Sequence, residues 1–178
     1  RSAQTALHQI TQALLRWMAP FLSFTAEEAW KIVGHSETIY LEKFTELPEG
    51  DAALLAKWSR IREIRDVVNK DIEAVRVEGK VGASLQAEVT ISAQHEDLAL
   101  LQTLADDLKF VLITSAAKAV AAAPDAQALA VDVKPSQAAK CERCWHYRDD
   151  VGSNPVHPTL CGRCDSNLHG TGETRSKA

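Results

Sequence analysis

The chain has 178 residues and a formal net charge of -4, with 46% hydrophobic and 25% charged residues. This balance is typical of one or two folded domains and excludes a chain that is disordered throughout. The sequence has no run of about 18 apolar residues and no basic segment ahead of an apolar one, so it predicts neither a membrane span nor a secretory signal, and the expected location is the reducing cytoplasm. Because the chain begins with Arg1 rather than Met, we expect a piece of a longer protein.

The charge is unevenly distributed along the chain. Residues 134–178 carry seven Lys or Arg against five Asp or Glu, although the whole chain is acidic. An acidic total argues against indiscriminate coating of DNA, whereas a local basic surface still binds phosphates.

The first 80 residues predict three helices. Apolar residues spaced three and four apart in residues 3–18 predict a helix with one buried stripe: Ala3, Leu7, Ile10, Leu14 and Trp17. Pro20 ends this helix, and Thr25 with Glu28 three residues later is typical of the start of a second one, which ends near Gly34.

A longer repeat predicts a third helix from Asp51 to Glu78. Its other face is the most basic of any predicted helix and includes Arg60, Arg62 and Arg65. Acidic residues alternate with these arginines, so the residues alone leave two interpretations open, a solvated face of intrahelical ion pairs or a surface that binds phosphates.

Beyond Gly82 the apolar period changes to two, which predicts a strand at residues 85–91. A helix around residues 95–108 and two further strands, at 110–114 and 129–133, complete a small α/β unit. The alanine-rich residues from 116 onward predict a connection. The predicted fold class is mainly α with a small α/β unit and a terminal zinc ribbon. The predicted parts are a helical domain (1–80), an α/β subdomain (81–133), a linker (134–139), the ribbon (140–168) and a flexible tail (169–178).

The ribbon contains every cysteine of the chain, in two C-x-x-C pairs separated by 16 residues: Cys141, Cys144, Cys161 and Cys164. This spacing is typical of zinc sites, because each pair turns two thiolates toward one ion. Four thiolates fill the coordination sphere, so we predict one structural zinc ion and no catalytic metal. The alternatives are a disulfide, a redox C-x-x-C pair, or replacement of one cysteine by His146 or His157.

Aromatic and basic residues alternate around the first cysteine pair. Trp145, His146 and Tyr147 lie between Arg143 and Arg148, and Arg163 lies in the second pair. One interpretation is that the arginines neutralise the charge of the zinc thiolates. The other is that the aromatics stack on unpaired nucleic-acid bases.

Several segments together resemble one family. LSFTAEEAW (22–30), KVGASLQAEVTI (80–91), FVLITSA (110–116), KCERCWHYRDDVG (140–152) and LCGRCDSNL (160–168) closely resemble, in this order, the C-terminal region of the bacterial isoleucyl-tRNA synthetases. The first segment is shared with the valine and leucine enzymes, whereas the ribbon is typical of the isoleucine enzymes.

The resemblance implies the helical anticodon-binding domain of a class I aminoacyl-tRNA synthetase, whose catalytic and editing domains would precede this region. The whole protein would be an isoleucine-tRNA ligase, which uses ATP. The family's H-I-G-H and K-M-S-K-S motifs have no counterpart here, since the chain has one methionine, Met18, and no H-x-G-H. We therefore predict that this part has no catalytic residues.

The implied partner is isoleucine tRNA, with neither DNA nor a membrane. On this hypothesis the ribbon binds the anticodon loop and the long helix binds the stem. The predicted contacts are Arg143, Trp145, His146, Tyr147, Arg148 and Arg163 in the ribbon, and Arg60, Arg62 and Arg65 in the helix.

Two alternatives of other classes remain open at this point. Bacterial formamidopyrimidine-DNA glycosylases end in a similar zinc motif, although their N-terminal proline nucleophile is missing here. A zinc-ribbon module that binds proteins would also present exposed aromatic residues.

Overall fold

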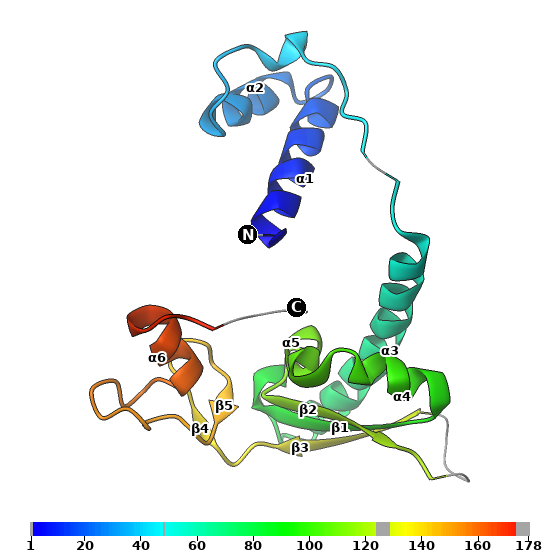
Figure 1. Cartoon of the computed structure of the whole chain (residues 1–178), viewed down its shortest axis with the longest axis vertical. Helices are drawn as coiled ribbons and strands as arrows, with labels where there is room; N and C mark the ends of the chain where they lie inside the picture. Colours follow the sequence, from blue (N-terminus) through cyan, green and yellow to red (C-terminus); the bar gives the residue numbers. More distant parts are fainter. Residues whose placement is uncertain (1, 48, 124–128, 174–178) are drawn as a thin grey trace. The chain divides into compact units, whose positions relative to one another are not determined.

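The computed structural model describes residues 2–47, 49–123 and 129–173. Internal contacts divide the chain into two compact units, Arg1–Gly50 and Asp51–Ala178, which we describe separately. The second unit contains a long helix, a small sheet and a terminal ribbon (Figure 1). No helix within these described ranges is both long enough and apolar enough to cross a membrane.

The first unit is a helical hairpin built around Trp30. Helices α1 (Ser2–Met18) and α2 (Ser23–Ile32) are followed by a 3-10 turn, η1 (Ile39–Leu41). The Trp30 Nε1 donates to the carbonyl oxygen of Glu37 at 3.1 Å. The rest of this core is small or aliphatic: Leu15, Ala19, Ala26 and Ile39. One buried tryptophan therefore joins both helices to the loop that follows them.

The apolar stripe of α1, which we predicted to be buried, is exposed. Leu7 is 62% exposed and Ile10 60%, and Leu14 and Trp17 are each 48% exposed. The residues buried in this part of the unit are instead Ala13, Leu15 and Ala19. An apolar stripe identifies the side of a helix that is available for packing, but it does not identify the neighbour that packs there. Helix α2 packs beside the stripe and not on it.

Helix α2 begins two residues before the predicted start. Ser23 is already helical, and the N–H of Ala26 donates to the carbonyl oxygen of Leu22 at 2.8 Å. The pairing predicted for Thr25 and Glu28 was therefore wrong, because the backbone is helical before Thr25 and needs no side-chain cap there.

Helix α3 (Ala52–Val77) confirms the long helix predicted from Asp51 to Glu78. The Oδ1 of Asp51 accepts a hydrogen bond from the N–H of Leu54 at 3.0 Å, which caps the helix. Its buried residues are spaced three or four apart: Ile61, Ile64, Val68 and Ile72. They pack on the sheet of the second unit, so α3 groups with the residues that follow it and not with α1 and α2.

The sheet has three strands in the order β2-β1-β3. Strand β1 (Ala87–Ala93) lies parallel to β2 (Ala116–Ala121) and antiparallel to β3 (Leu129–Pro135). Parallel pairing requires a crossover connection, which here contains α4 (His95–Gln102) and α5 (Leu108–Leu112). The strands predicted at 85–91 and 129–133 are thus confirmed as β1 and β3.

Helices α3, α4 and α5 cover one face of this sheet (Figure 1). Val89 and Ile91 on that face are buried, whereas Glu88 on the opposite face is exposed and Thr90 half-buried. Two 3-10 turns complete the unit, η2 (Ser84–Gln86) and η3 (Ala105–Asp107). The mainly helical fold class with a small α/β unit and a terminal ribbon is confirmed.

Two predictions in this region were wrong. Residues 110–114 do not form a strand: residues 110–112 are the end of α5, in which Leu108 and Leu112 are both buried, and Ile113 and Thr114 form the turn after it. A short apolar run fits a buried helix turn as well as a strand. The alanine-rich residues from 116 onward are not simply a connection, because they form β2, whose parallel partner lies far away in the sequence. Residues 124–128 of that stretch lie outside the described residues.

The ribbon consists of a two-stranded sheet and a short helix. Strand β4 (Ala139–Lys140) pairs with β5 (Tyr147–Arg148), and helix α6 (Gly162–His169) follows. Of the linker predicted at 134–139, only residues 136–138 lie outside strands, and buried Ser136 donates its N–H to the carbonyl oxygen of Gln86 at 2.8 Å. The connection is therefore short and tied to the sheet.

The tail predicted at 169–178 is only partly described. Glu173 pairs with Arg163 at 2.7 Å, and its N–H donates to the Oδ1 of Asn167 at 2.8 Å. The described part of the tail thus packs on α6, and residues 174–178 lie outside the described residues.

The packing of α3 on the sheet gives a stability test. Ile64 is 1% exposed in the shared core, whereas Val67, three residues later on the same helix, is 41% exposed. We expect Ile64→Ala to lower the free energy of unfolding by about 2–5 kcal/mol, and Val67→Ala to lower it by less than about 1 kcal/mol. Urea unfolding followed by amide signals of α3 and of β1 measures both. Separate transitions for α3 and β1 would contradict a shared core.

Candidate functional site

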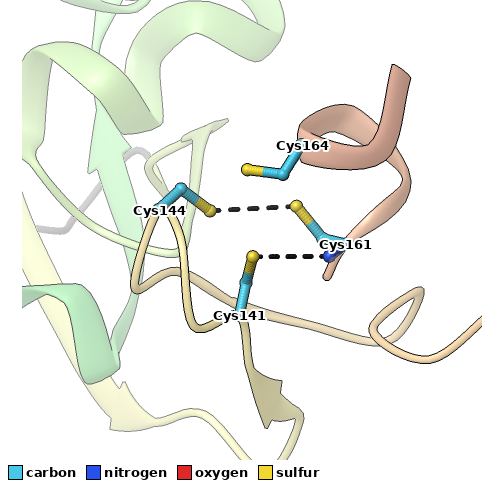
Figure 2. Close-up of side chains that lie close together, drawn as sticks. All are labelled: Cys141, Cys144, Cys161 and Cys164. Carbon is cyan, nitrogen blue, oxygen red and sulfur yellow. Dashed lines mark hydrogen bonds between the residues drawn. The ribbon is translucent and has the colours of Figure 1, made fainter. Parts of the chain in front are cut away.

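The four cysteines come together at the end of the second unit. Cys141 and Cys144 lie in the turn after β4, Cys161 precedes α6, and Cys164 lies in its first turn. We call these two turns knuckles (residues 141–144 and 161–164). Figure 2 shows the four side chains pointing toward one another, and their sulfur atoms all lie within 4.8 Å of each other.

The distances between the sulfurs fit a tetrahedral zinc site. The Sγ atoms of Cys144 and Cys161 are 3.8 Å apart, and all four cysteines are free of disulfides. A tetrahedron with Zn–S bonds of about 2.3 Å has edges of about 3.8 Å. The four cysteines therefore fit one structural zinc ion, and four thiolates leave no coordination position for a substrate.

Backbone and side-chain donors surround the thiolates. The N–H of Cys161 donates to the Sγ of Cys141 at 3.3 Å (Figure 2), and the guanidinium of Arg143 donates to the Sγ of Cys164 at 3.6 Å. These donors partly neutralise a centre that would carry two negative charges as Zn(Cys)4. Arg143 thus has a structural contact, as the first interpretation of the ribbon arginines expects.

The thiol pKa values differ within the cluster. Burial raises the pKa of Cys144 to about 12. Burial also acts on Cys141, but hydrogen bonds from the backbone N–H groups of Cys144, Cys161 and Arg143 outweigh it and lower its pKa to about 6. Cys141 therefore gives up its proton more readily than Cys144, whose proton zinc must displace. Binding of zinc is thus coupled to release of protons.

Trp145, directly after the first knuckle, has an unusual backbone conformation. Its φ is 64°, in the left-handed region, and its N–H donates to the carbonyl oxygen of Cys141 at 2.9 Å. Glycine adopts this conformation freely, whereas another residue there costs about 1–3 kcal/mol. Trp145 is 59% exposed, and the Nζ of Lys140 lies 5.5 Å from the centroid of its ring. More than half of the residue's surface is therefore open to solvent.

A groove runs between the ribbon and the loop that precedes β1. Its volume is about 250 Å³. It is lined by Gly82, Ala83, Leu85, Gln86, Lys140, Trp145 and Tyr147. Lys140 was not among our predicted RNA contacts. The sequence does contain a signal for it, because Lys140 directly precedes the first cysteine pair and lies five residues before Trp145. The loop residues had no such signal, because only the tertiary structure brings them to the ribbon.

The other ribbon residues predicted to contact RNA have partners within the protein. Arg148 pairs with Asp150 at 2.8 Å and lowers the pKa of that carboxyl group, and Arg163 lies 4.8 Å from the ring centroid of Phe110 and pairs with Glu173. His146 is half-buried with its ring edge on Phe110. These residues gather on the side of the ribbon that faces α5.

The α3 arginines lie on a different element from the ribbon. Arg60 makes two hydrogen bonds to Asp97, at 2.8 and 2.7 Å, and one to Glu63. Arg62 donates to the Oγ of Ser59 at 3.2 Å. The Nε of Arg65 is buried and has no hydrogen-bond partner among the described residues. The ion-pair interpretation thus holds for Arg60, and the RNA contacts of all three stay predictions.

A second cluster in the ribbon brings together His157, Asp165 and His169. The Nδ1 of His157 and the Oδ1 of Asp165 are 2.6 Å apart, and the two imidazole rings stack at 3.8 Å with an angle of 11° between their planes. Ring nitrogens bind a metal through lone pairs in the ring plane, so stacked parallel rings do not converge on one ion. The Nδ2 of Asn154 also donates to Asp165, so this cluster fastens the loop between the knuckles to α6.

Comparison with known proteins found two family models. One, described as the anticodon-binding domain of tRNA ligase, matches residues 1–91. The other, described as a zinc finger found in FPG and IleRS, matches residues 139–167 and includes all four cysteines.

The chain is also similar to curated proteins named isoleucine–tRNA ligase. It is 61% identical to that of Cupriavidus taiwanensis over 184 residues, and 55% identical to those of Ralstonia pickettii over 184 residues and Thiobacillus denitrificans over 181 residues. Each alignment covers 100% of this chain and 19% of the relative. The chain thus spans about a fifth of the length of the curated relatives it matches.

Elemental analysis of the purified protein should give one zinc per chain. Zinc release should increase as the pH falls, and most steeply below about pH 6, where Cys141 is protonated as well. Cys161→Ser should lower zinc occupancy, whereas Glu142→Gln, an exposed change inside the first knuckle, should leave it at one. Release that does not depend on pH would contradict coordination by four thiolates.

Proposed function

The chain belongs to the family of anticodon-binding domains of tRNA ligases, and from this premise we propose that it is the tRNA-binding C-terminal part of an isoleucine–tRNA ligase. In that protein it recognises the anticodon stem-loop of isoleucine tRNA in the cytoplasm. ATP-dependent attachment of isoleucine belongs to domains outside this chain. The identity of 55–61% to proteins named isoleucine–tRNA ligase supports the choice of amino acid.

The observation that carries the proposed RNA contact is Trp145. Trp145 is exposed, and its left-handed backbone beside the first knuckle costs free energy. Packing within the ribbon does not explain why a tryptophan, and not a glycine, occupies this position. Unpaired bases of an RNA loop stack on such aromatic side chains. Lys140 beside the ring supplies a positive charge for the phosphate of the same nucleotide. We therefore place one base of the anticodon loop on Trp145, at the groove.

The stem of the anticodon arm requires a different kind of contact. Side chains do not read the deep major groove of A-form RNA, so protein contacts to a stem go to phosphates and 2'-hydroxyls. On α3, Arg62 has a hydroxyl as its hydrogen-bond partner, whereas Arg60 is paired with Asp97 and Glu63. We assign stem contacts to Arg62 and Arg65 and give Arg60 a structural role.

A DNA glycosylase accounts for less of the chain. The zinc-finger description includes that class, but it concerns residues 139–167 alone. The match at residues 1–91 and the ligase names of the relatives favour the tRNA ligase.

Trp145→Gly separates an RNA contact from a packing role. Glycine adopts a φ of 64° without strain, so zinc binding should be retained or strengthened. Loss of one stacked base should weaken binding of the isoleucine anticodon stem-loop by about 5- to 150-fold. Fluorescence anisotropy with labelled RNA measures the affinity, and elemental analysis measures the zinc.

Two controls accompany this variant. Trp145→Phe keeps an aromatic ring and should lose less affinity, and Val156→Ala changes an exposed apolar residue of the ribbon outside the groove and should lose none. Unchanged RNA affinity in Trp145→Gly would refute the stacking contact. Loss of both zinc and RNA binding, with recovery in excess zinc, would mean that Trp145 only packs the ribbon.

A further inference from the structure

One buried hydroxyl group connects the sheet to the ribbon. Ser115 lies between α5 and β2 and is 7% exposed. Its hydroxyl donates to the carbonyl oxygen of Leu85, and its Oγ accepts a hydrogen bond from the N–H of Tyr147 at 2.6 Å. A hydroxyl has one proton and two lone pairs, so a single side chain satisfies a carbonyl and an amide at once.

The two backbone groups that Ser115 joins belong to opposite sides of the groove. Leu85 lies in η2, within the loop of residues 82–86 before β1, and Tyr147 is the first residue of β5 in the ribbon. Ser115 itself is fixed to the sheet, because its N–H donates to the carbonyl oxygen of Ala87 at 3.0 Å. The hydroxyl therefore defines the separation between the loop and the ribbon.

The N–H of Ser136, just before the ribbon, also donates to the carbonyl oxygen of Gln86 at 2.8 Å, whereas the ring contacts across this boundary are less directional. The ring of His146 meets Phe110 edge-on at 5.7 Å between centroids, and the guanidinium of Arg163 lies over the same ring. Ring contacts of this kind tolerate a small sliding movement, whereas a hydrogen bond weakens steeply when its angle changes. They hold the ribbon on α5 without fixing its register.

We infer that Ser115 is a positioning residue for the RNA-binding face: its hydroxyl sets the position of the ribbon, and with it Trp145, relative to the loop of residues 82–86. The consequence for RNA rests on the proposed function, whereas the mechanical role of the hydroxyl does not. Tyr147 is two residues from Trp145, so a ribbon released at Tyr147 also changes the width of the groove at Trp145.

The test is Ser115→Ala with three measurements on the zinc-loaded chain. Zinc content should stay at one per chain, because the hydrogen-bond partners of Ser115 are Leu85, Tyr147 and Ala87 and not a cysteine. Hydrogen exchange of the Tyr147 amide should accelerate by about 5- to 150-fold, the range that corresponds to loss of one buried hydrogen-bond partner. Affinity for the isoleucine anticodon stem-loop should fall by about 5- to 20-fold, within that same range.

Two further variants separate positioning from general loss of stability. Thr114→Val removes the neighbouring buried hydroxyl, whose partner is the carbonyl oxygen of Ala116 on the sheet side, and should change neither Tyr147 exchange nor RNA affinity. Ser115→Thr keeps the hydroxyl, so both the exchange rate of the Tyr147 amide and the RNA affinity should stay at the values of the unchanged chain. In a Trp145→Gly background, Ser115→Ala should cause no additional loss of RNA affinity, because it acts through Trp145.

Each remaining outcome counts against the inference. Unchanged Tyr147 exchange in Ser115→Ala would show that the hydroxyl does not hold the ribbon. Faster exchange with unchanged RNA affinity, or an additive loss in the double variant, would show that the hydroxyl does not position Trp145. If the unchanged chain binds no RNA, the proposed function fails, and exchange at Tyr147 still decides whether Ser115 fixes the ribbon.

Discussion

The ribbon depends on four thiolates that bind one ion. Between residues 139 and 167 the apolar residues packed on the cysteine cluster are few, mainly Val151 and Leu160, so the hydrophobic effect contributes little. Segments of this size generally need a metal or disulfides to hold one conformation. The zinc knuckles therefore fix the backbone, and the backbone in turn places Trp145 in its strained conformation and Lys140 beside it. The candidate RNA face is a consequence of metal coordination.

The face is nevertheless shared with the rest of the second unit. Phe110 on α5 contacts His146 and Arg163, and the loop before β1 forms the other side of the groove. These contacts explain why residues 51–178 group as one compact unit although the ribbon has its own metal. An RNA loop bound at Trp145 would thus contact both the ribbon and the loop of residues 82–86, and contacts within the protein set the distance between them.

Charge pairing limits what electrostatics contributes to binding. Arg60, Arg148 and Arg163 each pair with a carboxylate of the same chain, so their charges are partly neutralised before RNA arrives. Counterion release requires cations that neutralise phosphates, and among the described residues that line the groove Lys140 is the one cation. If RNA binds as proposed, stacking on Trp145 would carry a larger share of the affinity than ion pairing. The acidic net charge of the chain agrees with this balance.

The sequence by itself determined the features that depend on local spacing. Two C-x-x-C pairs specify a zinc site because each closes within one turn, and the repeat of α3 specifies a long helix because its apolar residues are three and four apart. Tertiary structure alone decided which faces are covered and which charges are paired. The stripe of α1 stayed exposed, residues 110–112 became helix, and an alanine-rich stretch became a strand because its partner lies in β1. Likewise, the link through Ser115 does not follow from neighbours in sequence, because it joins three segments that are distant along the chain.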